Sequence, residues 1–158
     1  MDVKFINPFI LGVQAVFKTM LSIDASMEKP YLKNKASSTG DVTGTLGFAG
    51  DKKGSFSISF RTNGALFVYK QLIGEESATV NEHVVDAIGE LTNIISGQAR
   101  KEFEKQGLTL NASIPMVVVG KDVEINFITK PPIVELPFKF PLDNGEMGEL
   151  FLNFSFEG

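Results

Sequence analysis

Hydrophobic positions recur along this sequence at two spacings, one of three to four residues and one of two. The longer spacing is typical of helices that bury one side. A helix is expected from Asn7-Pro8 to about Ser22, because Asn can accept hydrogen bonds from free N–H groups and Pro tolerates the first helical position. A short helix is expected over Asn63–Ile73, with Gly74 ending it.

The longest helix is expected to begin near Thr79 or Asn81, to continue past Phe103 and to stop at Gly107. On a helical wheel of about 100° per residue, four further apolar side chains fall within roughly 60° of Val84. They are Ile88, Leu91, Ile95 and Ala99. We predict that this apolar stripe faces the core.

The spacing of two predicts strands. Ser55–Phe60 alternates serine with Phe or Ile, and Asp41–Phe48 precedes it across the turn Gly50–Gly54. The glycines at positions 44, 47 and 50 are interpreted as strand glycines, because a phosphate-binding loop would need a helix after it. Four further strand-like segments follow the long helix: Leu108–Val119, Val123–Ile128, Ile133–Phe140 and Glu149–Phe156.

The order of the elements predicts the fold class. Turn residues at 120–122, 131–132 and 143–145 separate the last strands, and the polar stretch Glu28–Thr39 is expected to be an exposed connection. The chain thus reads as a helix, two strands, two helices and then several strands. Since strands and helices do not alternate throughout, we predict an α+β domain with a mostly antiparallel sheet, one long helix and two shorter ones.

Composition narrows the class of protein. With 158 residues, 43% of them hydrophobic, one domain over 1–158 is expected. The net charge of −4 disfavours binding to nucleic acid or to an anionic membrane. The sequence has no cysteine, which excludes thiol chemistry and Cys-ligated metals, and His83 is its one histidine. No stretch reads as a membrane span or a secretory signal, so a cytoplasmic location is expected.

A narrow polar stripe lies opposite the apolar stripe of the long helix. Asp86, Glu90, Asn93 and Gly97 fall at about 200°, 240°, 180° and 220° on the same wheel. A polar face alone is typical of any solvated amphipathic helix. A glycine at an exposed helical position costs about 1 kcal/mol relative to alanine. Gly97 therefore indicates a flat place against which another protein could lie.

The segment from Asp86 to Ala99 resembles the signature helix of the CheC/CheX/FliY chemotaxis phosphatases. The family pattern is Asp or Ser, three residues, Glu, two residues and Asn, which Asp86, Glu90 and Asn93 match. The resemblance covers nearly the whole chain: the opening helix, the segments 54–60 and 115–120 and the C-terminal strands come in the order of CheX. The first helix contains no Glu, so the chain has one motif, as in CheX, and departs from the two of CheC.

The resemblance implies hydrolysis of the aspartyl phosphate of a CheY-type response regulator in bacterial chemotaxis. It implies no cofactor of the chain's own, since the regulator supplies the phosphoryl group, Mg²⁺ and a lysine. Asn93 would hold and aim the attacking water, and Glu90 would pair with that lysine. Asp86 would contribute at the margin of the docking face, and Gly97 would provide its flat place.

Other functions remain open from the residues themselves. A family member could dock on a response regulator or a flagellar switch component without catalysis, because both roles would use the same helix face. A hydrolase built on His83 and Ser96 is disfavoured, since the two side chains lie about 140° apart on the helix. The carboxylates at 75–76 and at 102 and 104 are interpreted as solvated charges.

A homodimer is predicted from the family resemblance and from the apolar residues of the chain. CheX-like members are dimers by family resemblance, and the last strand carries Phe151 on its otherwise polar side, where it needs cover. In addition, 14 phenylalanines exceed what a small core readily hides, so some are expected at an interface.

Overall fold

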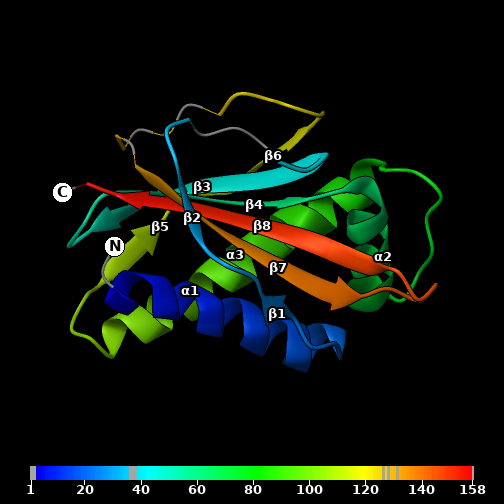
Figure 1. Ribbon diagram of the computed structural model, residues 1–158, viewed down its shortest axis with the longest axis horizontal. Coiled ribbons are helices and arrows are strands. Elements are labelled where there is room, and N and C mark those ends of the chain that lie inside the picture. The colour runs from blue at the N-terminus through cyan, green and yellow to red at the C-terminus, as the bar shows by residue number, and fades with distance from the viewer. Residues whose placement is uncertain (1–2, 36–38, 126, 128, 131, 158) are drawn as a thin grey trace.

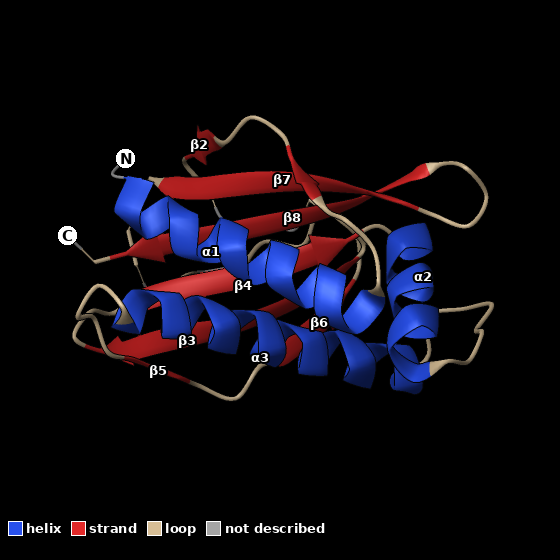
Figure 2. Ribbon diagram, turned by 90° about the horizontal axis from the view of Figure 1, so that it is seen from below, coloured by secondary structure: helices blue, strands red, loops and turns tan. Residues whose placement is uncertain are grey.

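Helices cover one face of an antiparallel sheet (Figures 1 and 2). The computed structural model describes residues 3–35, 39–125, 127, 129–130 and 132–157. Helix α1 (Val3–Val16) continues through the π-helical turn η1 (Phe17–Leu21) and is followed along the chain by α2 (Thr62–Ile73) and α3 (Glu82–Glu104). Helices α1 and α3 run side by side across the sheet, and α2 stands at one end of it (Figure 2).

The sheet contains eight strands in the described part of the chain. They are β1 (Ser26–Met27), β2 (Tyr31–Lys33), β3 (Val42–Gly50), β4 (Gly54–Phe60), β5 (Leu110–Ala112), β6 (Met116–Val119), β7 (Ile133–Pro141) and β8 (Met147–Phe156). The order is β1-β7-β8-β4-β3-β5, with β2 also paired to β7 and β6 to β3, and each pair is antiparallel. The predicted α+β class is therefore confirmed.

The ends of α2 and α3 follow the capping residues that the sequence indicated. Gly74 ends α2 with a φ of 86°, and Gly107 follows α3 with a φ of 81°. The side chain of Asn81 accepts hydrogen bonds from the backbone N–H groups of His83 at 3.0 Å and Val84 at 3.1 Å. These bonds satisfy two of the donors that a helix leaves free at its start, so α3 begins at a fixed residue.

Aromatic rings fill the space between the helices and the sheet. The ring centroid of Phe9 in α1 lies 4.4 Å from that of Phe154 in β8 and 5.4 Å from that of Phe103 in α3. Burial of one such side chain contributes about 1.5–3 kcal/mol. All 14 phenylalanines are buried or partly buried within the single chain, and Phe151 packs with the Arg61 guanidinium 5.4 Å from its ring centroid. The argument that surplus phenylalanine requires an interface is therefore wrong.

Helix α1 begins earlier than the sequence predicted. Asn7 and Pro8 lie inside the helix and not at its start. The nitrogen of Pro8 cannot donate to the carbonyl of Lys4 four residues earlier, and the side chain of Gln106 donates to that oxygen instead, at 3.0 Å. The apolar side chains at positions 5 and 6 pack against the core, which stabilises the additional turn. The predicted end near Ser22 is confirmed.

Two glycines let α3 lie close to α1 on one side and to β3 on the other. A Cβ atom at Gly12 of α1 would lie 3.2 Å from the backbone nitrogen of Ala99. A Cβ atom at Gly44 of β3 would overlap Oγ1 of Thr92, a buried hydroxyl that donates to the Ile88 carbonyl at 2.7 Å. Gly44 is thus a strand glycine, as predicted, and it admits a helix side chain rather than a phosphate.

We expect Gly44→Ala to destabilise the protein by about 1–3 kcal/mol, the usual range for an overpacked core position. Adding Thr92→Ala should recover part of this loss, because it removes the hydroxyl that the new methyl group meets. Gly47→Ala on the same strand is the matched control, since a Cβ atom there would make an ordinary 3.7 Å contact with the Gly54 carbonyl. Urea unfolding measures all four proteins, and equal losses for the two glycine variants would contradict the close approach.

The face of the sheet turned away from the helices carries polar side chains, and those of β4 are buried. All seven residues of β4 are buried, the serines included. Thr129 donates to Ser55 Oγ at 3.1 Å, and Ser155 Oγ donates to the carbonyl of Lys130 at 3.0 Å. Residues 129 and 130, which precede β7, therefore cover Ser55 and Ser155, and hydroxyl groups supply the hydrogen bonds that buried polar side chains need.

Three predictions about strands need correction. The segment Val123–Ile128 is not a regular strand where it is described, and Asn126 and Ile128 lie outside the described residues. Its apolar side chains at 123, 125 and 127 line a hollow over β3, and Glu124 between them forms an isolated β-bridge instead of a strand.

The predicted strand Leu108–Val119 is divided into β5 and β6, which both pair with β3. Within the polar stretch Glu28–Thr39, β2 pairs with β7 through backbone groups that a side-chain pattern does not reveal. Just before that stretch, β1 pairs with β7 in the same way.

A charged cluster is buried on the polar face. Oε1 of Glu135 accepts hydrogen bonds from Lys33 Nζ at 3.2 Å, Thr39 Oγ1 at 2.7 Å and Asn153 Nδ2 at 3.2 Å. In the part of the chain that the structure describes, Glu135 Oε2 and Asn153 Oδ1 have no hydrogen-bond partner. Burial raises the pKa of the Glu135 carboxyl above its ordinary value of 4.5, against the opposing effect of the Asn153 hydrogen bond.

This raised pKa predicts a pH dependence of stability. Because the folded protein holds the Glu135 proton more tightly than the unfolded chain, the stabilisation is fully present below pH 4.5 and is lost as the pH rises through the higher native pKa. Glu135→Gln should remove this decline. The measurement is the free energy of unfolding in urea from pH 4.5 upward, and a variant whose profile runs parallel to that of the wild type would contradict the prediction.

Candidate functional site

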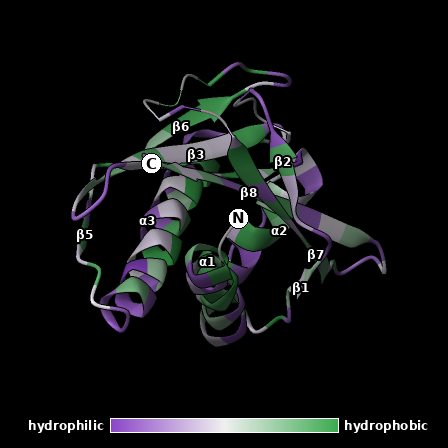
Figure 3. Cartoon of the chain, turned by 60° about the vertical axis from the view of Figure 1, so that its left-hand side comes forward, coloured by the Kyte–Doolittle hydropathy of each residue, from purple (hydrophilic) through white to green (hydrophobic). Residues whose placement is uncertain are grey.

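Helix α3 places the predicted apolar stripe in the core. The five residues of the stripe are all buried: Val84, Ile88, Leu91, Ile95 and Ala99. Figure 3 shows that hydrophobic and hydrophilic residues both occur along the length of α3. Because the stripe is buried, the rotation of α3 about its axis is fixed, and the side chains opposite the stripe point away from the core.

The motif residues lie on the outer face of this helix. Asp86, Glu90 and Asn93 are exposed, as the wheel predicted. Successive residues rise about 1.5 Å along a helix, so Glu90 lies about 6 Å beyond Asp86 and Asn93 about 4.5 Å beyond Glu90 along the axis. Two carboxylates and one amide thus stand in a row of about two turns, with their polar groups in water and available to a partner.

The hydroxyl groups of α3 do not belong to this row. Ser96 is buried, and its Oγ donates to the Asn93 carbonyl at 2.9 Å. His83 is exposed in the first turn of the helix. The structure does not bring the two together as nucleophile and base, in agreement with their separation on the wheel.

Gly97 continues the face toward the end of the helix and is partly buried. A Cβ atom at this position would lie 3.6 Å from Arg100 Nη2, an ordinary contact with the end of a flexible side chain. Among the described residues, packing within the chain therefore does not require glycine here. The flat place predicted for a partner remains a prediction.

A groove of about 610 Å³ lies beside the motif. We call it the motif groove. It is lined by side chains of η1, α2 and α3 and by Glu75 just after α2, and its lining includes Met20, Tyr69, Leu72, Ile73, Asp86, Glu90 and Ile94. Its floor is apolar, and two motif carboxylates stand on one wall. The motif thus borders a concave surface that three separate segments build.

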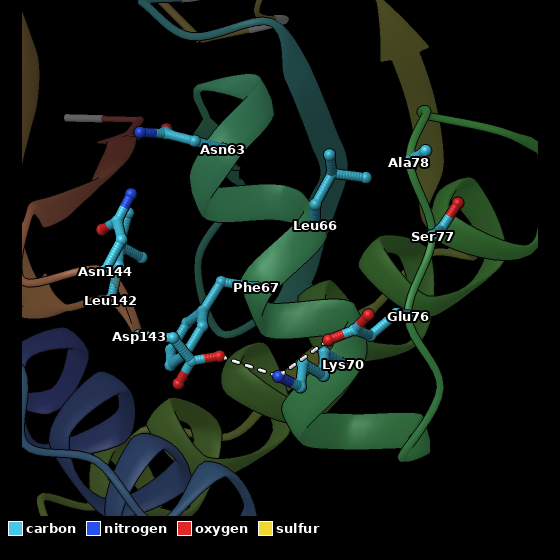
Figure 4. Close-up of a pocket in the computed structure, with 10 residues that line it drawn as sticks. All are labelled: Asn63, Leu66, Phe67, Lys70, Glu76, Ser77, Ala78, Leu142, Asp143 and Asn144. Atoms are coloured by element: carbon cyan, nitrogen blue, oxygen red, sulfur yellow. Dashed lines mark hydrogen bonds and ion pairs between the residues drawn. The ribbon is translucent and has the colours of Figure 1, made fainter.

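A second hollow, of about 570 Å³, lies on the other side of α2 (Figure 4). Lys70 Nζ lies 2.9 Å from Asp143 Oδ2 and 3.1 Å from Glu76 Oε1, and both carboxylates raise the pKa of Lys70. These ion pairs connect α2 to the β7–β8 turn and to the loop before α3. None of the motif residues lines this hollow, so its charges are structural contacts.

Comparison with known proteins assigns the family. The family model described as chemotaxis phosphatase CheX matches residues 42–139, more than half of the chain. The chain belongs to the CheX family. A curated relative, the CheY-P phosphatase CheX of Thermotoga maritima, is 29% identical over 137 residues, which cover 84% of this chain and 88% of the relative. The resemblance drawn from the motif helix is therefore confirmed.

Solved CheX structures share the fold over almost the whole chain. The chemotaxis protein CheX of Desulfovibrio desulfuricans superposes with a TM-score of 0.84 and 35% identity, covering 98% of this chain and 99% of that one. The CheX-CheY-BeF3-Mg²⁺ complex from Borrelia burgdorferi has a TM-score of 0.77 and 26% identity, with coverage of 99% and 100%. Among the helices described for this CheX family member, none is long and apolar enough to cross a bilayer.

The floor of the motif groove was not predicted from the sequence. Met20, Tyr69, Leu72 and Ile73 follow ordinary apolar patterns in their own helices. Their place beside Glu90 depends on the packing of η1 and α2 against α3, which no local pattern encodes. The available signal in the sequence was Ile73 itself, a large apolar residue directly before Gly74, which ends the predicted helix.

Proposed function

We propose that this CheX family member hydrolyses the aspartyl phosphate of a CheY-type response regulator. The observation that supports it most is the exposure of Asp86, Glu90 and Asn93 on one face of a helix whose opposite face is fixed in the core. The family match and the name of the Thermotoga maritima relative support the activity. The Borrelia burgdorferi complex, which contains CheX with CheY, supports the partner.

We assign to Asn93 the role of holding the attacking water. An acyl phosphate is already reactive, so most of what a catalyst must add is a water held in line with the phosphorus atom. The amide of Asn93 offers a donor and an acceptor and does not titrate, which suits it to hold and aim that water. Glu90 pairs with the lysine of the regulator, and Asp86 and Gly97 contact its surface at the margin.

The magnesium ion is assigned to the regulator and not to this chain. When bound there, it offsets the negative charge of the phosphoryl oxygens. In the described residues, no three His, Asp or Glu side chains lie close enough together to hold a metal ion. The motif face of this chain contributes two carboxylates and an amide, which position the partner and the water.

Phosphate release tests this function directly. Purified response regulators of the same organism are phosphorylated, and their loss of phosphate is followed with and without the protein. Acceleration beyond self-hydrolysis of one regulator is expected. Binding without acceleration would favour the alternative, a non-catalytic module that docks on a response regulator or a flagellar switch component. We place the activity in the cytoplasm and treat residues 1–158 as one domain.

We also propose that the protein is a homodimer, and the residues that support this proposal differ from those that the sequence indicated. The phenylalanines are covered within the chain, but Ile114, Met116 and Val119 are exposed at and just before β6. Sedimentation at micromolar concentration should give a mass of twice 17.2 kDa. A mass of 17.2 kDa across ordinary salt concentrations would contradict the dimer.

A further inference from the structure

The motif groove has an apolar floor that the positioning of a water does not use. Met20 of η1 is 41% exposed and Ile73 of α2 is 52% exposed. Tyr69 is buried, and Leu72 and Ile94 are partly buried, so they form the base beneath the two exposed side chains. Large apolar side chains open to water in a concave surface are typical of a site that another molecule covers.

The rim of the groove is acidic and continuous with the motif. Glu75 lies on one side and Asp86 and Glu90 lie on the other, all three exposed. The described residues that line the groove include His83 but no Lys or Arg. This charge favours an occupant that brings a basic group to the rim and an apolar group to the floor. Since Glu90 belongs to both surfaces, a partner that reaches Glu90 lies at the edge of the groove.

We propose that the motif groove binds an apolar side chain of the response regulator, on a surface segment that also carries a basic residue. The inference rests on the proposed function, because the occupant belongs to the same partner. Contact with Met20 and Ile73 would add an affinity that salt does not screen, beside the salt-sensitive pairing of Glu90. The groove would then fix the orientation of the regulator while Asn93 faces its phosphoryl group.

Two polar variants from different elements test the groove. Ile73→Asn and Met20→Gln each replace an apolar side chain with an uncharged polar one, and both sites are exposed. Leu32→Asn on β2 is the matched control, because Leu32 is 60% exposed and lies at the far edge of the sheet. Affinity is measured for a regulator loaded with BeF₃⁻ and Mg²⁺, and turnover for the phosphorylated regulator.

Each groove variant is expected to raise Kd and KM about five- to tenfold and to leave kcat unchanged. The loss should persist at high salt, and Leu32→Asn should match the wild type. The apolar surface residues of the regulator can also be replaced by alanine one at a time. At one position, the loss of affinity should not add to the loss caused by Ile73→Asn, because the two side chains make the same contact.

Wild-type affinity in both groove variants would overturn the proposal. A change in sedimentation mass with Ile73→Asn and unchanged regulator binding would also overturn it, because the groove would then contact a second copy of this chain. If the wild type releases no phosphate but its binding to the loaded regulator is weakened by both variants, the groove assignment holds and the catalytic function fails. The two failures are thereby distinguished.

Discussion

Asn93→Ala is expected to lose most of the rate enhancement, roughly 100-fold or more, while it still binds the phosphorylated response regulator. Asn93 is exposed opposite the buried stripe of α3, so its truncation removes no core packing. A methyl group can neither donate to a water nor accept from it, which is why the loss should fall on kcat. Phosphate release against enzyme concentration gives the rate, and the BeF₃⁻-loaded regulator gives the affinity.

Asn7→Ala is the matched control for this variant, because Asn7 is also exposed and lies on α1. It should keep full activity. If Asn93→Ala keeps near-full activity instead, the water-positioning role is wrong. An inactive wild type with tight regulator binding would leave the docking module as the function of this chain.

Glu90→Ala should differ in kind from Asn93→Ala. A carboxylate that pairs with the regulator's lysine acts during encounter and in the complex, so its loss is expected to weaken binding on the order of tenfold and to lower the rate as well. The defect in binding should shrink as salt rises, since ions screen an exposed charge pair. Affinity and rate measured from low to moderate salt test both parts.

Glu104→Ala controls for the change of net charge. Glu104 is exposed on the same helix, 14 residues beyond Glu90 and about 21 Å along its axis. Its removal should leave affinity, rate and salt dependence near those of the wild type. Equal effects of the two substitutions would falsify a specific contact at Glu90 and leave only a general effect of charge.

The sequence was most informative where local chemistry decides the structure. Asn81 and Gly107 set the ends of α3, and the apolar stripe between them was strong enough to predict its rotation. The start of α1 was missed because the hydrogen bond lost at Pro8 is replaced by Gln106, about a hundred residues away. Strands β1 and β2 were missed for a similar reason, since they pair through their backbones with β7.

The candidate site divides in the same way. Asp86, Glu90 and Asn93 were found because they share one face of one helix, and the structure exposes them on that face. The floor of the motif groove joins η1, α2 and α3, so it follows from tertiary packing alone. Phe151 shows the opposite error: it was predicted to need a partner chain, whereas the described chain itself covers it.

The close packing of α3 against Gly12 and Gly44 limits the ways in which the activity of this protein could be inhibited. A site on a mobile loop can be inactivated by local disorder, which leaves the rest of the fold intact. Here the backbone under Glu90 and Asn93 belongs to the core, so disordering it would unfold the protein. We therefore expect cellular control to act by occlusion of the outer face or by the supply of partner, and inhibitors to succeed by covering this helix rather than by distorting it.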